Sequence, residues 1–423
     1  MGNTDLSHAK KTKKDEFYTQ WEDIEKEVNS YIEFNPDVFK NKTILLPADD
    51  PFESNFFKFF ASHFNDYGLK KLIATSYDPS PIINTQLQLS LFDEPETETV
   101  ISKAYKIELS DVSDFDDNGR ININDVESML KAEKRLIDMG KKSSVLSYLN
   151  GDTDPDDKER FSAGDFRSEE VTKLKNEADV IITNPPFSLF REFIEWINPN
   201  KKQFSIIGNV NAITYKSVFP LIKGNKTWLG ESIHSGDREF KVPNHYPLNS
   251  AGYRVDENGN KYIRVKGVRW FTNLPNGNRY QKLQLMNMQD NLKFSKHQPI
   301  KDLGYVKYDN YNAIEVPFTD SIPSDYEGIM GVPITFLDKY NPEQFEILGL
   351  TSGREEFSKE AWPSKRYVNA IQHNKNGSTT SGSKANTRAT ILLDKVPEET
   401  YYTADNAEGP LKIVYARVLI RKK

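Results

Sequence analysis

The sequence contains no cysteine among its 423 residues. Without a thiol the chain can form no disulfide, no thiolate metal site and no covalent intermediate on a cysteine nucleophile. Histidine is also scarce. The six histidines are scattered along the chain, and no two of them stand at metal-ligand spacing. We therefore expect no bound metal.

Long apolar runs and a strong net charge are missing as well. No run approaches the length needed to span a membrane, and residues 1–18 are polar and basic rather than apolar, unlike a secretory signal. We therefore expect a cytoplasmic protein without a membrane partner. A net charge of -6 and a pI near 5.7 give no global nucleic-acid signature, so any basic surface must be local.

One local basic stretch is present. Between Lys261 and Lys301 the chain has nine lysines and arginines against a single acid, Asp290, whereas acidic residues are concentrated at 93–98 and 111–127. A solvated charged face explains such unevenness, and so does a phosphate-binding surface. The chain length exceeds what one hydrophobic core usually serves, so we expect two domains.

The first half alternates apolar strands with helices. Helical spacing covers 21–32, and a strand, helix and strand follow at 42–50, 54–64 and 70–78. This order is a βαβ unit, which predicts a parallel sheet. More helices are expected at 124–139, 168–178 and 188–197, with strands at 178–184 and 203–209. The pattern predicts a doubly wound α/β domain that binds ligands at the carboxyl ends of its strands.

The remaining segments break this pattern. Residues 79–98 are rich in proline and acid and are expected to form a surface insertion, and 254–271 alternate like a hairpin around a turn at 257–260. Residues 373–388 are polar and rich in Gly and Ser, which predicts a mobile loop. We place the boundary near Leu274, giving domains 1–274 and 275–423, the second of mixed α+β character.

The stretch DVIITNPPFSLF, residues 179–190, contains the most informative motif. Two prolines fix φ and remove two backbone donors, which holds the nearby carbonyls in a rigid geometry. The Asn184 side chain and the Pro185 carbonyl then present two acceptors that suit an amino group, while Phe187 can lie against the ring that carries it. The alternative is a strand-end turn that happens to contain Pro185 and Pro186.

These four residues, Asn184 to Phe187, resemble the (N/D/S)PP(Y/F) signature of amino-methyltransferases. That resemblance implies methyl transfer from S-adenosyl-L-methionine (SAM) to N6 of adenine, N4 of cytosine or a related amino nitrogen. Methylation of cytosine C5 requires a cysteine nucleophile and is excluded. Neither a metal nor a general base is demanded, because the methyl group is already activated on sulfur.

Longer phrases extend the resemblance over nearly the whole chain outside 79–98. KKDEFYTQ, SNFFKFFA, GLKKLIA, GDFRSEE, TNPPFSLFREF, VRWFTNL and GVPITFLDKYNPEQFEI are similar to the EcoRI-type adenine-specific DNA methyltransferases. The resemblance implies a Rossmann-like SAM-dependent catalytic domain followed by a C-terminal target-recognition domain. It also implies methylation of adenine N6 in a restriction-modification or phage-protection context.

The resemblance assigns cofactor-binding roles. Tyr18 and Thr19 match a segment that touches the methionine part of the cofactor, and Asp50 with Phe52 matches an Asp-Pro-Phe motif whose acid binds the ammonium. Asp78 is the candidate for the ribose, Asp165 for the adenine and Phe166 for packing on that ring. The chain departs from the family in its first loop, where Glu53, Ser54 and Asn55 replace Gly-x-Gly. Aspartates at strand ends are also common helix N-caps.

A base within a duplex cannot reach such a pocket, so the adenine should be flipped out and stacked on an aromatic ring. Besides Phe187, Trp270 and Phe271 are candidates for the second wall, or else they belong to the core. Double-stranded DNA is the expected partner, with phosphate contacts from Lys261, Arg264, Lys266, Arg269, Arg279 and Lys282. Arg354, Arg366 and Asn374 are candidates for reading base edges.

A further signal lies in the insertion. QLSLF, with Gln88, Leu89, Leu91 and Phe92, resembles the pentapeptide with which bacterial replication proteins dock onto the sliding clamp, and an amphipathic edge strand is the alternative. The protein is otherwise expected to be a monomer.

Residues 114–125 have the oxygen-ligand spacing of a calcium loop. An Asn-Gly turn before a helix N-cap is an alternative explanation of the same sequence pattern.

Two rival functions stay open. One is methylation of a different amino nitrogen, such as cytosine N4 or an RNA base. The other is a catalytically inactive DNA- and clamp-binding protein, which the glycine-poor first loop suggests.

Overall fold

The computed structural model describes residues 18–47, 49–77, 104–115, 117–152, 160–234, 236–242, 252–351, 361 and 363–423. The chain divides into two compact units, which are described separately below. Unit 1 comprises Met1–Ala212 and Lys226–Asn276, and unit 2 comprises Ile213–Asn225 and Gly277–Lys423. None of the helices among the described residues has the length and apolar character needed to cross a lipid bilayer.

Unit 1 is built on an eight-stranded sheet with the order β4-β3-β2-β1-β5-β6-β11-β7. The four central strands run parallel, and the two outer strands on each side pair antiparallel. The expected βαβ unit is confirmed, since Thr43 of β1 pairs in parallel with Lys71 of β2. The strands are β1 (Thr43–Leu46), β2 (Lys71–Thr75), β3 (Tyr105–Leu109), β4 (Leu146–Tyr148), β5 (Val180–Thr183), β6 (Gln203–Asn209), β7 (Trp228–Leu229) and β11 (Val268–Thr272).

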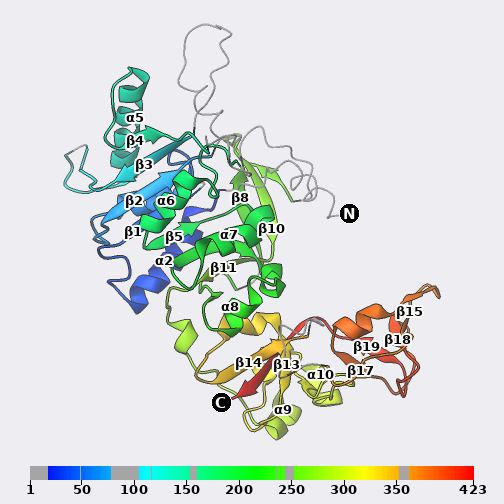
Figure 1. Cartoon of the computed structure of the whole chain (residues 1–423). Coiled ribbons are helices and arrows are strands. Elements are labelled where there is room, and N and C mark those ends of the chain that lie inside the picture. The colour runs from blue at the N-terminus through cyan, green and yellow to red at the C-terminus, as the bar shows by residue number, and fades with distance from the viewer. Residues whose placement is uncertain are drawn as a thin grey trace. The chain divides into compact units, whose positions relative to one another are not determined.

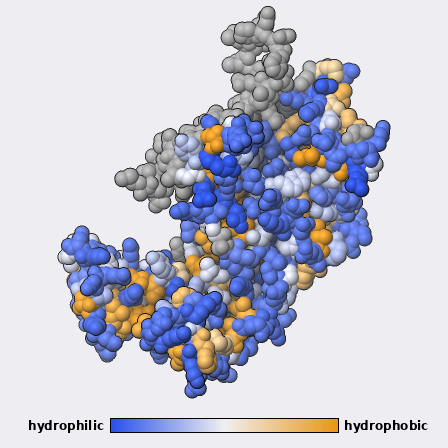
Figure 2. Space-filling view, turned by 180° about the vertical axis from the view of Figure 1, so that it is seen from behind, coloured by the Kyte–Doolittle hydropathy of each residue, from blue (hydrophilic) through white to orange (hydrophobic). Residues whose placement is uncertain are grey.

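Both faces of this sheet are covered by helices (Figure 1). Side chains alternate along a strand, so Ile44 and Leu46 of β1 join the larger core with α2, α3 and α5, whereas Leu45 packs with residues of α6 and α7. The view in Figure 2 shows a largely hydrophilic outer surface over this unit. The helices are α2 (Trp21–Phe34), α3 (Asn55–Ser62), α5 (Ile123–Asp138), α6 (Glu169–Glu177) and α7 (Phe190–Ile197), with short 3-10 turns η1 (Phe187–Leu189) and η2 (Val210–Thr214).

A small antiparallel sheet, β8-β10-β9, packs on the larger core of unit 1. Phe240 on β8 and Ile263 on β10 are buried there, while Arg264 and Lys266 on the other face of β10 are exposed. The expected hairpin is confirmed for 254–266, because β9 pairs with β10 and the Asp256 carboxylate accepts the backbone N–H groups of Asn258 and Asn260 in the turn. The rest of the expected hairpin is not, since Val268–Thr272 form β11 and pair with β6 in the eight-stranded sheet. The strands are β8 (Asp237–Val242), β9 (Arg254–Val255) and β10 (Lys261–Lys266).

The loop before α5 has the geometry of a helix cap. Asn122 and Asp125 form a capping box at the start of α5. The Asp114 carboxylate accepts the backbone N–H groups of Asn118 and Gly119, and Asp125 accepts those of Phe115 and Asn122. Over the part of the chain that the structure describes, no cluster of three or more acidic or histidine side chains could hold a metal. These contacts form the turn and cap, whereas Asp116 of the predicted calcium loop lies outside the described residues.

Unit 2 contains two sheets. A four-stranded sheet has the order β12-β13-β20-β14, and a five-stranded sheet has the order β16-β15-β18-β19-β17. The elements are α8 (Phe219–Lys223), η3 (Asn278–Tyr280), α9 (Met288–Phe294), α10 (Gln298–Leu303), β12 (Ile314–Glu315), η4 (Thr319–Ser321), β13 (Met330–Pro333), η5 (Ile334–Lys339), β14 (Phe345–Leu350), β15 (Ile371–His373), β16 (Thr379–Ser381), η7 (Ser383–Thr387), β17 (Thr390–Leu392), β18 (Tyr401–Thr403), β19 (Leu411–Ile413) and β20 (Arg417–Lys422).

The polar segment 373–388 is not the loop that its composition predicted. It completes the hairpin of β15 and β16 and continues into η7. Side chains supply the bonds that hold its turn, because Asn374 Nδ2 donates to Ser378 Oγ over 3.0 Å and Asn376 Oδ1 accepts the Ser378 N–H over 3.1 Å. A sequence rich in Asn, Ser and Gly thus forms a defined hairpin here.

Candidate active site

The candidate site lies where the parallel strands of unit 1 end. Asp49 and Asp50 follow β1, Ser76 follows β2, and Asn184 follows β5. Since β1 pairs with both β2 and β5, these strand ends are neighbours along one edge of the sheet. This is the position that the sequence pattern predicted for a ligand site.

The Asn-Pro-Pro-Phe turn is firmly supported. Asn184 is 8% exposed, and both following prolines are buried. Thr183, the last residue of β5, donates its hydroxyl to the Pro47 carbonyl over 3.0 Å and also contacts the Asp49 carboxylate. Phe187 opens the turn into α7 and is only partly buried, with its ring edge-on to Phe240 at 6.5 Å. The turn therefore presents an amide and a ring from a rigid base.

Asp49 and Asp50 form a buried acidic pair. Asp49 accepts hydrogen bonds from the hydroxyl of Thr183 and, over 2.9 Å, from that of Ser54, the N-cap of α3. Burial raises the pKa of Asp49 to about 7 and that of Asp50 to about 6. Both carboxyl groups are therefore poised to respond to a cation placed beside them.

Asp50 has its own set of partners. Its Oδ1 accepts the Phe52 N–H over 2.9 Å and the Tyr105 hydroxyl over 2.6 Å. The rings of Phe52 and Tyr105 meet edge to face at 5.8 Å. These contacts fix the direction of the carboxylate at the start of the first loop.

The segment at Tyr18 and Thr19 lies against the same loop. Asn55 Nδ2 donates to the Thr19 carbonyl over 2.7 Å, and the backbone of Tyr18 pairs with Lys241 of β8. Thr19 is 3% exposed, and its hydroxyl has no hydrogen-bond partner among the described residues. A buried hydroxyl in that state suits a ligand.

In the Gly-Asp-Phe segment, residues 164–166, the glycine packs closely against the end of β2 at the edge of the site. Gly164 has φ of +77°, and a Cβ there would lie 1.9 Å from the Ser76 carbonyl oxygen, so only glycine allows this approach to the end of β2. Asp165 forms a bidentate pair with Arg167 at 2.9 and 2.7 Å. Phe166 is 3% exposed and packs on Phe193 of α7 at 4.9 Å. These contacts do not favour the cofactor roles predicted for Asp165 and Phe166.

The predicted DNA-binding residues fall into two groups. Arg264, Lys266 and Lys282 are exposed and Lys261 is partly exposed. Arg269 is 4% exposed and donates to the carbonyls of Val268 and His234, while burial lowers the pKa of Arg279 to about 10. These two guanidinium groups are used inside the fold and do not present a surface for phosphates.

Trp270 and Phe271 are core residues in this structure. They are 1% and 0% exposed on β11. The Trp270 ring meets Phe56 at 5.9 Å, and the Phe271 ring meets Phe190 at 5.1 Å. The expectation that they wall a base pocket is not supported, because all five residues of β11 are buried.

Several predicted residues lie outside the described part of the chain: Asp78, Gln88, Leu89, Leu91, Phe92 and Arg354. Conversely, sequence reasoning missed Asp49, Asn55 and Tyr105. The Asp49-Asp50 doublet was a visible signal, since both acids follow one strand. Tyr105 gave none, because it follows the insertion and reaches Asp50 only through the pairing of β2 with β3.

Comparisons with known proteins identify the family of the chain. Residues 5–423 match the family described as adenine-specific methyltransferase EcoRI. The chain is 40% identical to the type II methyltransferase M.EcoRI of Escherichia coli over 351 residues, which are 83% of this chain and 90% of that protein.

A second relative is more distant. The type II methyltransferase M.MpnI of Mycoplasma pneumoniae is 31% identical over 346 residues, covering 81% of this chain and 84% of that protein. No solved structure matches significantly. The resemblance seen in the sequence phrases is confirmed, and the chain belongs to the family of EcoRI-type adenine-specific DNA methyltransferases.

Proposed function

We propose that this enzyme transfers a methyl group from SAM to N6 of an adenine flipped out of a specific DNA sequence. The observation that carries the proposal is the rigid Asn184–Phe187 turn, held at the sheet edge beside two buried carboxyl groups. N6 specificity and the identity of the methyl donor are parts of the proposal.

The chemistry follows from two acceptors on one amino group. Asn184 Oδ1 and the Pro185 carbonyl each accept one hydrogen of the adenine amine, which draws its lone pair out of ring conjugation. The prolines limit backbone rotation at this point, so the two oxygens keep their spacing. Phe187 stacks on the flipped base, with Phe240 packed behind it.

The residues at the site fit SAM. When bound, SAM supplies an activated methyl group on a sulfonium centre. Asp50 would hold its ammonium group, and the buried Thr19 hydroxyl with Tyr18 would contact the methionine part, near Phe52. Asp78, Asp165 and Phe166 complete the predicted set, although the Arg167 pairing and the burial of Phe166 support the last two less.

DNA binding is proposed for the exposed basic residues. Arg264 and Lys266 share one face of β10, and the partly exposed Lys261 begins the same strand. Lys282 of unit 2 is exposed as well. Cations of this kind bind phosphates without regard to sequence and release counterions.

The biological setting is also part of the proposal. The relatives are named type II methyltransferases, which supports a restriction-modification role. A phage-protection role, docking to a sliding clamp through Gln88–Phe92, a cytoplasmic location and a monomeric state stay predictions.

The proposal is tested by product analysis. DNA treated with the enzyme and SAM, then digested to nucleosides, should yield N6-methyladenine by mass spectrometry. N4-methylcytosine as the product would support the rival amino nitrogen. Calorimetry with SAM distinguishes the proposal from the alternative of a catalytically inactive DNA-binding protein. A folded protein that releases no heat with SAM would contradict the proposal.

A further inference from the structure

The C-terminal part of unit 2 is basic although the protein is acidic. Residues 361–423 contain eleven lysines and arginines against five acids, in a chain whose net charge is -6. The five-stranded sheet of unit 2 lies within this segment. A concentration of positive charge of this kind is the electrostatic footprint of a nucleic-acid partner.

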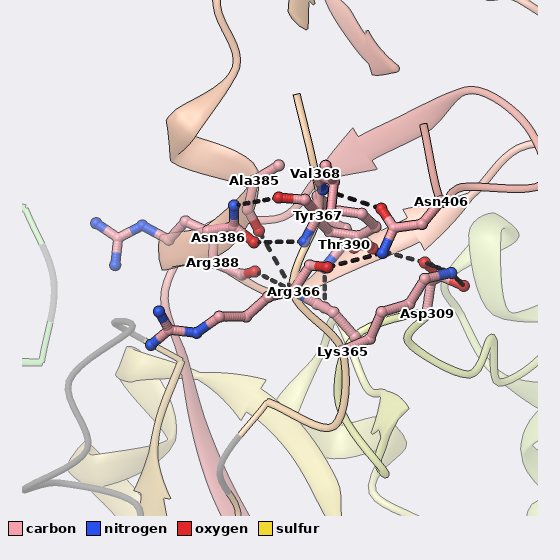
Figure 3. Close-up of polar contacts among 11 residues, drawn as sticks. Asp309, Lys365, Arg366, Tyr367, Val368, Ala385, Asn386, Arg388, Thr390 and Asn406 are labelled. Atoms are coloured by element: carbon pink, nitrogen blue, oxygen red, sulfur yellow. Dashed lines mark hydrogen bonds and ion pairs between the residues drawn. The ribbon is translucent and has the colours of Figure 1, made fainter. Parts of the chain in front are cut away.

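Within it, a short segment at Arg366–Val368 lies outside the helices and strands but has a tightly held backbone (Figure 3). Asn386 accepts the Tyr367 N–H over 2.8 Å and donates to the Tyr367 carbonyl over 3.0 Å. Asn406 accepts the Val368 N–H over 3.0 Å and donates to the Arg366 carbonyl over 2.8 Å. Two asparagine side chains thus do what a neighbouring strand would do in a sheet.

The side chains on either side of Arg366, those of Lys365 and Tyr367, anchor the segment to Asp309. Tyr367 is 5% exposed, and its hydroxyl donates to Asp309 over 2.7 Å and contacts the Thr390 hydroxyl. Lys365 pairs with the same Asp309 at 3.0 Å. Asp309 is therefore occupied by Lys365 and Tyr367.

Arg388 is held in a similar way. Its carbonyl accepts Asn310 Nδ2 over 2.8 Å, and one guanidinium nitrogen donates to the Thr351 carbonyl over 3.3 Å. Figure 3 shows the side chains of Arg366 and Arg388 extending to the same side of the segment, away from Asp309 and Asn406. Arg366 is exposed and Arg388 is partly exposed.

We propose that Arg366 and Arg388 read base edges of the target DNA and so help to set which sequence is methylated. This inference rests on the proposed function. A guanidinium group pairs bidentately with the two major-groove acceptors of guanine, and this requires accurate placement. A flexible lysine is sufficient for a phosphate contact. Base reading requires a side chain that starts from a fixed backbone position, and the hydrogen bonds to the backbone of Arg366–Val368 fix that position.

The test uses the full-length enzyme in cells without other adenine methyltransferases, with single-molecule sequencing of the genome. In Arg366→Ala and Arg388→Ala we expect methylation to spread to sequences that differ from the wild-type site at one position. The preference for the correct base there should fall roughly ten- to a hundredfold. Arg366→Lys keeps the charge but not the bidentate fork, so it should relax the same position.

Lys412→Ala is the matched control: Lys412 is another cation of the basic segment 361–423, exposed on β19, and its loss should keep the wild-type sequence pattern. Thermal unfolding shows whether each variant is folded. If Arg388→Ala does not fold, the two Arg366 variants still test the inference, because Arg366 is exposed.

Two results would overturn the inference while leaving the proposed function intact. One is a wild-type sequence pattern in both alanine variants. The other is uniformly weaker methylation of all sequences, which would identify phosphate contacts. If the wild-type enzyme itself produces no N6-methyladenine, the proposed function fails and this inference fails with it.

Discussion

Asp49 and Asp50 are adjacent in the sequence but have different hydrogen-bond partners. Asp49 binds two hydroxyl groups of the protein, whereas Asp50 binds one hydroxyl and one backbone N–H at the start of the first loop. Burial raises the pKa of both. Their protonated forms therefore stabilise the folded, cofactor-free protein at low pH, and this contribution is lost as pH rises through about 6 to 7.

Cofactor affinity should depend on pH through Asp50. An ammonium group prefers the ionised carboxylate, whose pKa in the free protein is raised to about 6 by burial. We expect affinity for SAM to be constant above pH 7 and to weaken as pH falls below 6, by up to about tenfold per pH unit. Calorimetry between pH 5 and 8 measures this. Asp50→Asn should bind weakly at every pH, and equal wild-type affinity at pH 5 and 8 would refute the role.

Trp270 should matter for stability. Because its ring is 1% exposed and packs on Phe56, Trp270→Ala should lower the free energy of unfolding by about 3 to 5 kcal/mol. Urea unfolding measures the change. The exposed Arg264→Ala is the comparison and should stay within about 0.5 kcal/mol. A Trp270→Ala protein of normal stability that fails to bind DNA would restore the base-wall interpretation.

At the scale of elements, one contact joins the ends of the two strands that precede the proposed catalytic and cofactor-binding residues. Thr183 ends β5 and bonds to Asp49 beyond β1, so the Asn-Pro-Pro-Phe turn and the first loop, which follows β1, are held together. The sequence places both strand ends on one edge of the sheet, but the hydroxyl that links them follows only from the structure.

Loss of that link should slow catalysis without weakening DNA binding. We expect Thr183→Val to reduce kcat about tenfold or more, with KM for DNA nearly unchanged, because a shift of the turn disturbs the transition state. Thr183→Ser keeps the hydroxyl and should restore the rate. Steady-state kinetics of the three proteins decides, and equal kcat for the valine variant and the wild type would show that the bond positions nothing.

The predictable elements are those with a strong local pattern. The helices and strands from 21 to 78 and from 168 to 209 follow apolar periodicity and are confirmed. The outer strands β7 and β11 were not assigned to this sheet, since β7 has only two residues and β11 lies almost wholly within 254–271, which was expected to form a separate hairpin. The hairpin of β15 and β16 was missed because polar side chains such as Asn374 and Ser378 hold its turn.

At the scale of the whole molecule, the site draws on distant parts of the chain. Asn184 and Asp50 could be predicted as site residues from the sequence because each belongs to a short motif at a strand end. The contact of Tyr105 with Asp50 depends on the pairing of β2 with β3, which are separated in the sequence by residues 76–104 and which no local pattern brings together. Trp270 and Arg269 sit in a basic, aromatic stretch, yet the fold buries both.

An acidic protein that binds DNA must do so through local patches, and salt should reveal them. The logarithm of the DNA association constant should fall linearly with the logarithm of salt concentration. Replacing Lys261, Arg264 and Lys266 together by Ala should reduce the slope by roughly one for each phosphate-binding cation that is removed. Fluorescence anisotropy at several salt concentrations measures it. Lys26→Ala on α2 should leave the slope unchanged, and an unchanged slope in the triple variant would exclude β10 as a phosphate-binding surface.

The most direct test of the central claim is the single-turnover rate of Asn184→Ala. Calorimetry and anisotropy first establish that the variant is folded and still binds SAM and DNA. Loss of one acceptor for the adenine amine should then lower the rate of methyl transfer by roughly a hundredfold or more. A variant that transfers methyl groups at the wild-type rate would contradict the account.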